Sequence, residues 1–101
     1  MTESVNIERI RTLLDEKELL CNLAEKCVDM SKSAMKVRRV IDGRNHAVYE
    51  GKVAWSSLYE DVAEVLLALR CLNIRVDSAT IKSVQENKIR QWVCGLEENA
   101  R

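Results

Sequence analysis

The feature that most constrains this chain is an apolar stripe that keeps helical period from about Glu16 to Ile41. The stripe consists of Leu20, Leu23, Ala24, Cys27, Ser31, Ala34, Met35 and Ile41. Spacings of three and four residues put these side chains on one face of a helix. The 101 residues include no proline and only three glycines, so little interrupts helical structure. A helix this long needs neighbours along its whole length.

Three further helices are expected around this one. The first spans about residues 4–15, the third spans about 52–72, and the last begins after Asp77 or Ser78, either of which is a good N-cap. Their apolar stripes are Ile7, Ile10 and Leu14; Leu58, Val62, Val65, Leu66, Leu69 and Leu72; and Ile81, Val84, Ile89, Trp92, Val93 and Leu96. Asp42-Gly43-Arg44-Asn45 predicts a loop that extends to Gly51. Residues 97–101 are expected to fray.

These elements predict one all-α domain over residues 1–101, an antiparallel bundle of about four helices. Stripes this wide on so few helices also indicate a homo-oligomer, a homodimer or homotetramer that shares its core between subunits. Trp92 is assigned to the core, because aromatic residues at helical spacing more often pack than stack on a base.

Charge and hydropathy argue against several partners. Sixteen basic residues balance sixteen acidic ones, so no positive field favours a nucleic-acid polymer or an anionic membrane. No apolar run reaches membrane-spanning length and charges interrupt the N-terminus, which indicates a cytoplasmic protein. The four cysteines form no CxxC pair and the single His46 lies far from them, so reduced and mostly buried thiols are expected.

Carboxylates gather on the two central helices. Glu25 and Asp29 are one turn apart on the second helix, and Glu60, Asp61 and Glu64 cluster on the third. On a helical wheel Asp29, Asp61 and Glu64 lie beside the apolar stripes, so they can point into the groove between the helices. Carboxylates converging from two helices suit magnesium, which prefers oxygen ligands. Solvated charges on amphipathic helices give the same spacing, and the spacing alone leaves both interpretations open.

Two segments resemble the signature of the MazG-like all-α nucleoside triphosphate pyrophosphohydrolases, in which an EExxE helix is followed by an EExxD helix. They are LAEKCVDMSKSAMKVRRVIDGRN and LYEDVAEVLLAL. The resemblance runs from about Glu18 to Trp92 and includes NKIRQW, which is similar to a Lys-rich last helix in such proteins. It implies a Mg²⁺-dependent enzyme that cleaves a nucleoside triphosphate between the α and β phosphates, giving monophosphate and pyrophosphate.

The resemblance also implies roles for individual residues. Glu25, Lys26 and Asp29 stand at the EExxE positions, and Glu60, Asp61 and Glu64 stand at the EExxD positions. It implies Mg²⁺ held by Asp29, Asp61 and Glu64, with Glu25 or Glu60 as the catalytic group that aids water activation. Candidates for binding substrate phosphates are Lys88 and Arg90, together with Lys36 and Arg39 in a basic stretch that includes Arg38 and Arg44. The same stretch is equally typical of an exposed helix C-terminus, where basic side chains interact favourably with the helix dipole.

Lys26 is the largest departure from the family pattern, because an ammonium cannot bind a cation. It can neutralise the carboxylates as a salt bridge, or contact a substrate phosphate while Mg²⁺ still binds. Three hypotheses follow. The chain is a pyrophosphohydrolase impaired at Lys26, a non-hydrolysing nucleotide-binding or sequestering protein on the same fold, or a structural helical bundle whose acidic cluster is only a salt-bridge network.

Overall fold

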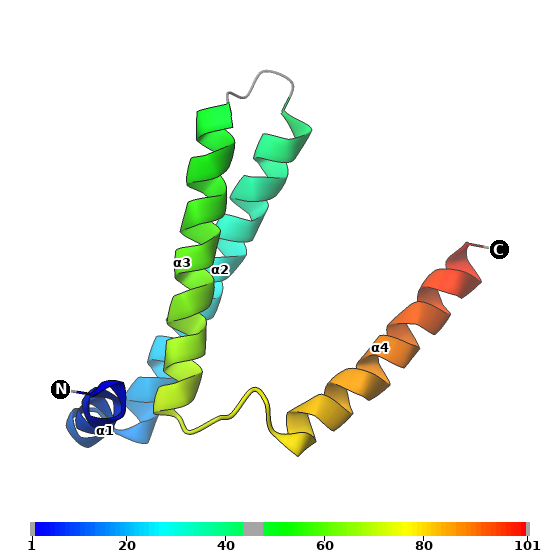
Figure 1. Ribbon diagram of the computed structural model, residues 1–101. Helices are drawn as coiled ribbons and strands as arrows, with labels where there is room; N and C mark the ends of the chain where they lie inside the picture. The colour runs from blue at the N-terminus through cyan, green and yellow to red at the C-terminus, as the bar shows by residue number, and fades with distance from the viewer. Residues whose placement is uncertain (1, 44–47, 101) are drawn as a thin grey trace.

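The computed structural model describes residues 2–43 and 48–100, which fold into four helices (Figure 1). These are α1 (Glu3–Leu13), α2 (Glu16–Asp42), α3 (Val48–Cys71) and α4 (Ala79–Asn99). No strand occurs in these two ranges, so the predicted all-α class and the number of helices are confirmed. Arg44 of the basic stretch and the single histidine, His46, lie outside the described residues. None of the described helices is both long and apolar enough to span a membrane.

The start of α2 is fixed by a capping box. An Asp15 side-chain oxygen accepts a hydrogen bond from the Glu18 amide at 2.7 Å, and a Glu18 side-chain oxygen accepts one from the Asp15 amide at 3.3 Å. The two contacts satisfy two backbone donors that a helix leaves free at its N-terminus. α2 then continues to Asp42, one residue beyond the expected end.

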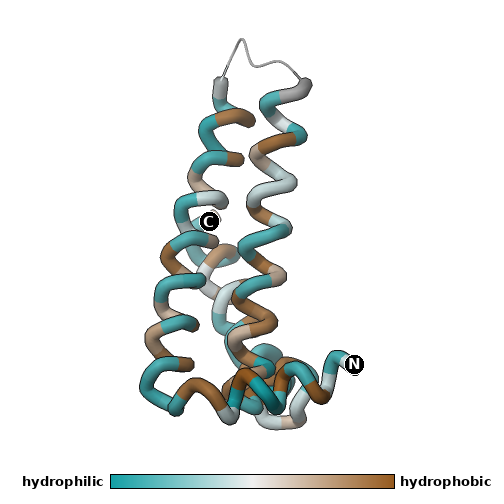
Figure 2. Tube along the Cα trace, turned by 90° about the vertical axis from the view of Figure 1, so that its left-hand side faces the viewer, coloured by the Kyte–Doolittle hydropathy of each residue, from teal (hydrophilic) through white to brown (hydrophobic). Residues whose placement is uncertain are grey.

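α2 and α3 form a long antiparallel hairpin, with apolar residues recurring along both helices (Figures 1 and 2). The less exposed side chains follow alternating steps of three and four residues, the spacing of a coiled-coil seam. On α2 this inner seam is Leu19, Leu23, Lys26, Met30, Ser33, Val37 and Val40. On α3 it is Gly51, Ala54, Leu58, Asp61, Val65 and Ala68, and it continues to Leu72 directly after the helix. Small residues such as Ala54 and Ala68, both buried, let the helices approach closely.

The prediction that the loop extends to Gly51 is wrong, because α3 already begins at Val48. A Cβ placed on Gly51 would lie 3.7 Å from Val40 Cγ1, so Gly51 is a packed inner-seam position of the hairpin. The contact with α2 outweighs the weak helix preference of a single glycine, which local sequence rules treated as a loop signal.

α1 packs against α3 at the foot of the hairpin, where Arg70 donates to Glu3. α3 ends in a Schellman motif: the Ile74 amide bonds the Leu69 carbonyl and the Asn73 amide bonds the Arg70 carbonyl, both at 2.9 Å. Asn73 has a φ of 60°, the left-handed conformation that this motif requires. The chain therefore turns off the α3 axis at this residue.

α4 points away from the hairpin and packs along none of the other described helices (Figure 1). Ser78 is its N-cap, accepting from the Ile81 amide at 3.3 Å, and the helix runs to Asn99, into the segment expected to fray. Trp92 is 71% exposed, so its assignment to the core is wrong for a single chain. The four cysteines are free, as expected, but the expectation that most of them are buried is wrong. Only Cys71 is buried, because Cys21 and Cys27 lie on uncovered faces of α2 and Cys94 lies on α4.

Candidate functional site

The two acidic motifs meet in the middle of the hairpin. Lys26 Nζ on α2 lies 3.1 Å from Glu64 Oε2 on α3. About two turns further along α2, the Ser33 hydroxyl donates a hydrogen bond to Asp61 Oδ2. Because Lys26, Ser33 and Asp61 all occupy inner-seam positions, the seam here is polar where a helix pair would normally bury apolar side chains.

Lys26 is the electrostatic centre of this cluster. Its hydrogen bond to Glu64 raises the pKa of the ammonium above its ordinary value, and the charge of Glu64 raises it further. Partial burial opposes the rise, while the charges of Asp29 and Glu25 add to it. The ammonium therefore stays protonated at neutral pH and carries the positive charge of the site.

The residues that the resemblance assigns to Mg²⁺ suit that ion in their chemistry but not in their arrangement. Asp29, Asp61 and Glu64 offer the hard oxygen donors that Mg²⁺ prefers. In the structure, however, Glu64 is held by Lys26 and Asp61 by Ser33. Among the described residues, no three His, Cys, Asp or Glu side chains gather closely enough to hold a metal. The positive charge that Glu64 faces in the structure is therefore the ammonium of Lys26.

The two proposed catalytic carboxylates lie at the edge of this cluster. Glu25 and Glu60 are exposed, whereas Asp29 is half-buried. Exposed carboxylates are accessible to water, which a general base needs, although the same exposure is typical of a solvated helix face.

The basic candidates are spread along the chain. Lys36 and Arg39 are exposed on α2, and Lys36 lies ten residues beyond Lys26, about 15 Å along the helix axis. Arg38, which lies between Lys36 and Arg39 in the sequence, pairs with Asp42 at 3.6 Å near the end of α2. Lys88 and Arg90 are exposed on α4. Within one chain the structure does not bring these two residues to the carboxylates of α2 and α3.

Sequence reasoning missed Ser33 as a member of the polar seam. The available signal was its spacing: Ser33 follows Lys26 by seven residues, so both lie on the same face of α2. A hydroxyl two turns from an ammonium on an otherwise apolar seam indicates a polar partner on the facing helix.

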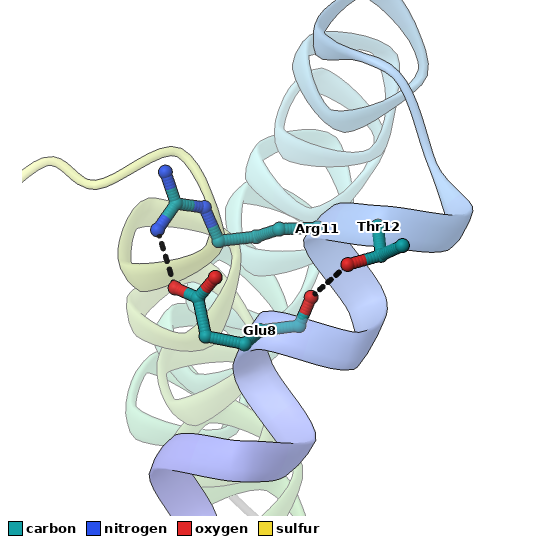
Figure 3. A network of polar contacts seen from close by, with 3 residues as sticks. All are labelled: Glu8, Arg11 and Thr12. Atoms are coloured by element: carbon teal, nitrogen blue, oxygen red, sulfur yellow. Dashed lines mark hydrogen bonds and ion pairs between the residues drawn. The ribbon is translucent and has the colours of Figure 1, made fainter.

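A cavity of about 530 Å³ lies away from the carboxylates, between α1, the end of α3 and the segment that leads to α4. Arg11, Arg70 and Arg75 line it, but each has a carboxylate partner. Arg11 pairs with Glu8 at 2.8 Å (Figure 3), Arg70 with Glu3, and Arg75 with Asp77 at 3.6 Å. With their charges compensated in this way, the arginines do not make the cavity an anion site.

No protein-family model, no curated protein and no solved structure matches the chain in the comparisons made.

Proposed function

We propose that this chain is a nucleotide-directed protein of the MazG-like pyrophosphohydrolase type, converting a nucleoside triphosphate to monophosphate and pyrophosphate with Mg²⁺. The observation that carries the proposal is that the two acidic motifs face each other across α2 and α3, joined by the 3.1 Å contact between Lys26 and Glu64. A cytoplasmic location goes with the proposal, because such substrates are found there.

The charge of the site supports a requirement for a cation. The two helices bring five carboxylates and one ammonium to it: Glu25, Asp29, Glu60, Asp61, Glu64 and Lys26. This excess of negative charge would repel a triphosphate that arrived without a cation. Bound Mg²⁺ would offset the negative charge of carboxylates and phosphates and polarise the bond that is cleaved.

The protein's own residues have distinct parts in this proposal. Asp29, Asp61 and Glu64 would hold the ion, and Glu25 or Glu60 would take a proton from the attacking water. Because these three carboxylates do not converge in the structure, they would have to move together to hold the ion. Glu64 would then part from Lys26, whose ammonium could contact a phosphate oxygen.

The positions of the remaining cations limit their use. Lys36 and Arg39 lie further along α2, where only an extended part of the substrate could reach them. Lys88 and Arg90 lie on α4, so they could serve this site only from the α4 of another copy of the chain.

The proposal predicts low activity in the native sequence. We expect slow pyrophosphate release from a panel of nucleoside triphosphates with Mg²⁺, and at least a tenfold increase in Lys26→Glu, which restores a carboxylate at that position. Lys17→Glu is the matched control, because it makes the same charge change nine residues away on α2 and should leave the rate unchanged. Pyrophosphate release from none of the three proteins would overturn the proposal.

The Lys26–Glu64 contact favours a second candidate, a non-hydrolysing nucleotide-binding or sequestering protein. In this candidate the Lys26 ammonium replaces Mg²⁺ between α2 and α3. The chain could then still bind a nucleotide but would not hydrolyse it. Nucleotides with Mg²⁺ would then raise the melting temperature of the native chain without pyrophosphate release. A melting temperature that no nucleotide changes would leave only the structural role for this cluster.

A further inference from the structure

A single chain does not enclose its own apolar surface. Its accessible area is 8449 Å², whereas a compact monomer of 11.6 kDa exposes about 5,800 Å². Its radius of gyration is 17.7 Å, against about 13 Å for a compact domain of this length. The excess of about 2,600 Å² is surface that a folded protein normally covers.

One part of the uncovered surface is a continuous face of the hairpin. Each residue of this face comes directly after an inner-seam residue in the sequence. The residues are Leu20, Ala24 and Cys27 on α2 and Trp55, Tyr59 and Leu66 on α3. One residue along a helix is a rotation of about 100°. Since α2 and α3 are antiparallel, equal rotations turn both sets toward the same side of the hairpin. We call this side the open face.

Two observations support the continuity of the open face. The rings of Trp55 and Tyr59 lie 6.3 Å apart, in contact range for an aromatic pair. At the foot of the hairpin, Leu66 belongs to the open face and also lines the 530 Å³ cavity together with Ile7 and Ile74. The open face therefore carries apolar side chains from its hollowed lower end at Leu66 to the Trp55–Tyr59 pair, with Ser31 as a polar residue on α2.

The second uncovered surface is the apolar side of α4. Ile81, Val84, Ile89, Trp92 and Leu96 lie on one half of this helix, and all but Ile81 are more than half exposed. Gln85 and Lys88 lie on the same half and are its polar members. The α4 stripe from Ile81 to Leu96 spans fifteen residues, about 22 Å. Because Lys26 lies opposite Glu64, the open face from Leu20 to the level of Trp55 has about the same length.

Local hydrogen bonds direct α4 away from the open face of its own chain. The Schellman motif at Asn73 turns the chain off α3. A further turn, in which the Ser78 amide bonds the Arg75 carbonyl at 3.1 Å, precedes the Ser78 N-cap. The direction of α4 is thus fixed by hydrogen-bonded turns at both ends of the segment that joins α3 to α4.

We propose that the apolar side of α4 packs on the open face of a second copy of this chain, and that the second copy returns its own α4 to the first. Each copy has an open face and an α4, so a reciprocal exchange forms a closed dimer with two-fold symmetry. Both the open face and the apolar side of α4 are then covered in each copy. Covering about 2,600 Å² on each chain, about 5,200 Å² in total, lies at the upper end of the range of obligate dimers. The equal numbers of basic and acidic residues mean that no net charge opposes self-association.

Sedimentation and light scattering of the full chain test the exchange. We expect twice the single-chain mass of 11.6 kDa for the native protein, and the single-chain mass for Trp92→Glu, which puts a charge in the middle of the α4 stripe. Asn87→Glu is the matched control on the opposite side of α4 and should remain dimeric. A native protein of single-chain mass, or a dimer that persists in Trp92→Glu, overturns the proposal.

A second variant distinguishes loss of the dimer contact from misfolding of Trp92→Glu. Leu66→Glu places the charge on the open face, so it should release the same dimer from the other side of the contact. Circular dichroism shows whether each variant keeps its helices. A helical Leu66→Glu protein that stays dimeric would also overturn the exchange.

Discussion

At the scale of single residues, Lys26 decides what the acidic cluster can do. The ammonium occupies an inner-seam position and pairs with Glu64, but neither side chain is fully buried: they are 30% and 47% exposed. Partly exposed ion pairs contribute little to folding stability, because water screens the charges. The main consequence of Lys26 is therefore electrostatic: it supplies the positive charge around which the carboxylates are arranged.

The charge state of Lys26 gives a prediction about pH. Its pKa is raised above the ordinary 10.5 by Glu64, so the stabilising contact is fully present below that pH and is lost as the pH rises through the higher folded-state pKa. The stability difference between the native chain and Lys26→Met should be constant from pH 6 to 9 and shrink above about 10.5. Urea unfolding at each pH measures it. A difference that already disappears by pH 9 would mean that Glu64 does not hold the ammonium.

At the scale of the helices, the turn after α3 depends on one left-handed residue. Asn73 has a φ of 60°, which asparagine and glycine tolerate better than other residues. We expect Asn73→Ala to lower the free energy of unfolding by about 1 kcal/mol and Asn73→Gly to leave it nearly unchanged. Denaturant unfolding compares the two variants. Equal losses in both would show that the asparagine side chain, not the backbone conformation, matters here.

Gly51 gives the opposite prediction inside α3. A Cβ there would meet Val40 Cγ1 at 3.7 Å, an ordinary contact that requires no rearrangement. Gly51→Ala should therefore raise the free energy of unfolding by roughly 0.5–1 kcal/mol, the usual gain from replacing glycine in a helix. Thermal and denaturant unfolding measure the change. A loss of stability in Gly51→Ala would instead indicate that α2 and α3 lie closer together at Gly51 than in the structure.

The helices differ in how far the sequence could predict them. The start of α2 and the N-cap of α4 were predictable, because Asp15, Glu18 and Ser78 act within one turn. The early start of α3 was not, because it depends on Gly51 meeting Val40 from another helix. Helical spacing also put the carboxylates on facing sides of α2 and α3, but it could not tell which of them Lys26 would pair with. The exposure of Trp92 was beyond sequence rules, because an apolar stripe does not say which molecule covers it.

At the scale of the whole molecule, the uncovered α4 links stability to protein concentration. If two chains exchange this helix, folding and association are one process, and the melting temperature rises with concentration. We expect the native melting temperature to increase over a hundredfold range of concentration, while that of Trp92→Glu stays constant and lower. Calorimetry at several concentrations compares them. A native melting temperature independent of concentration would argue for a monomer.

The most direct test of the central claim, that Lys26 stands in the place of a cation, is calorimetric titration of Mg²⁺ into the native chain and Lys26→Glu, with Lys17→Glu as the control. We predict that Lys26→Glu binds Mg²⁺ at least tenfold more tightly than the native chain, and that Lys17→Glu matches the native chain. Equal Mg²⁺ affinity in the native chain and Lys26→Glu would contradict the claim, because the ammonium would then not compete with a metal for these carboxylates.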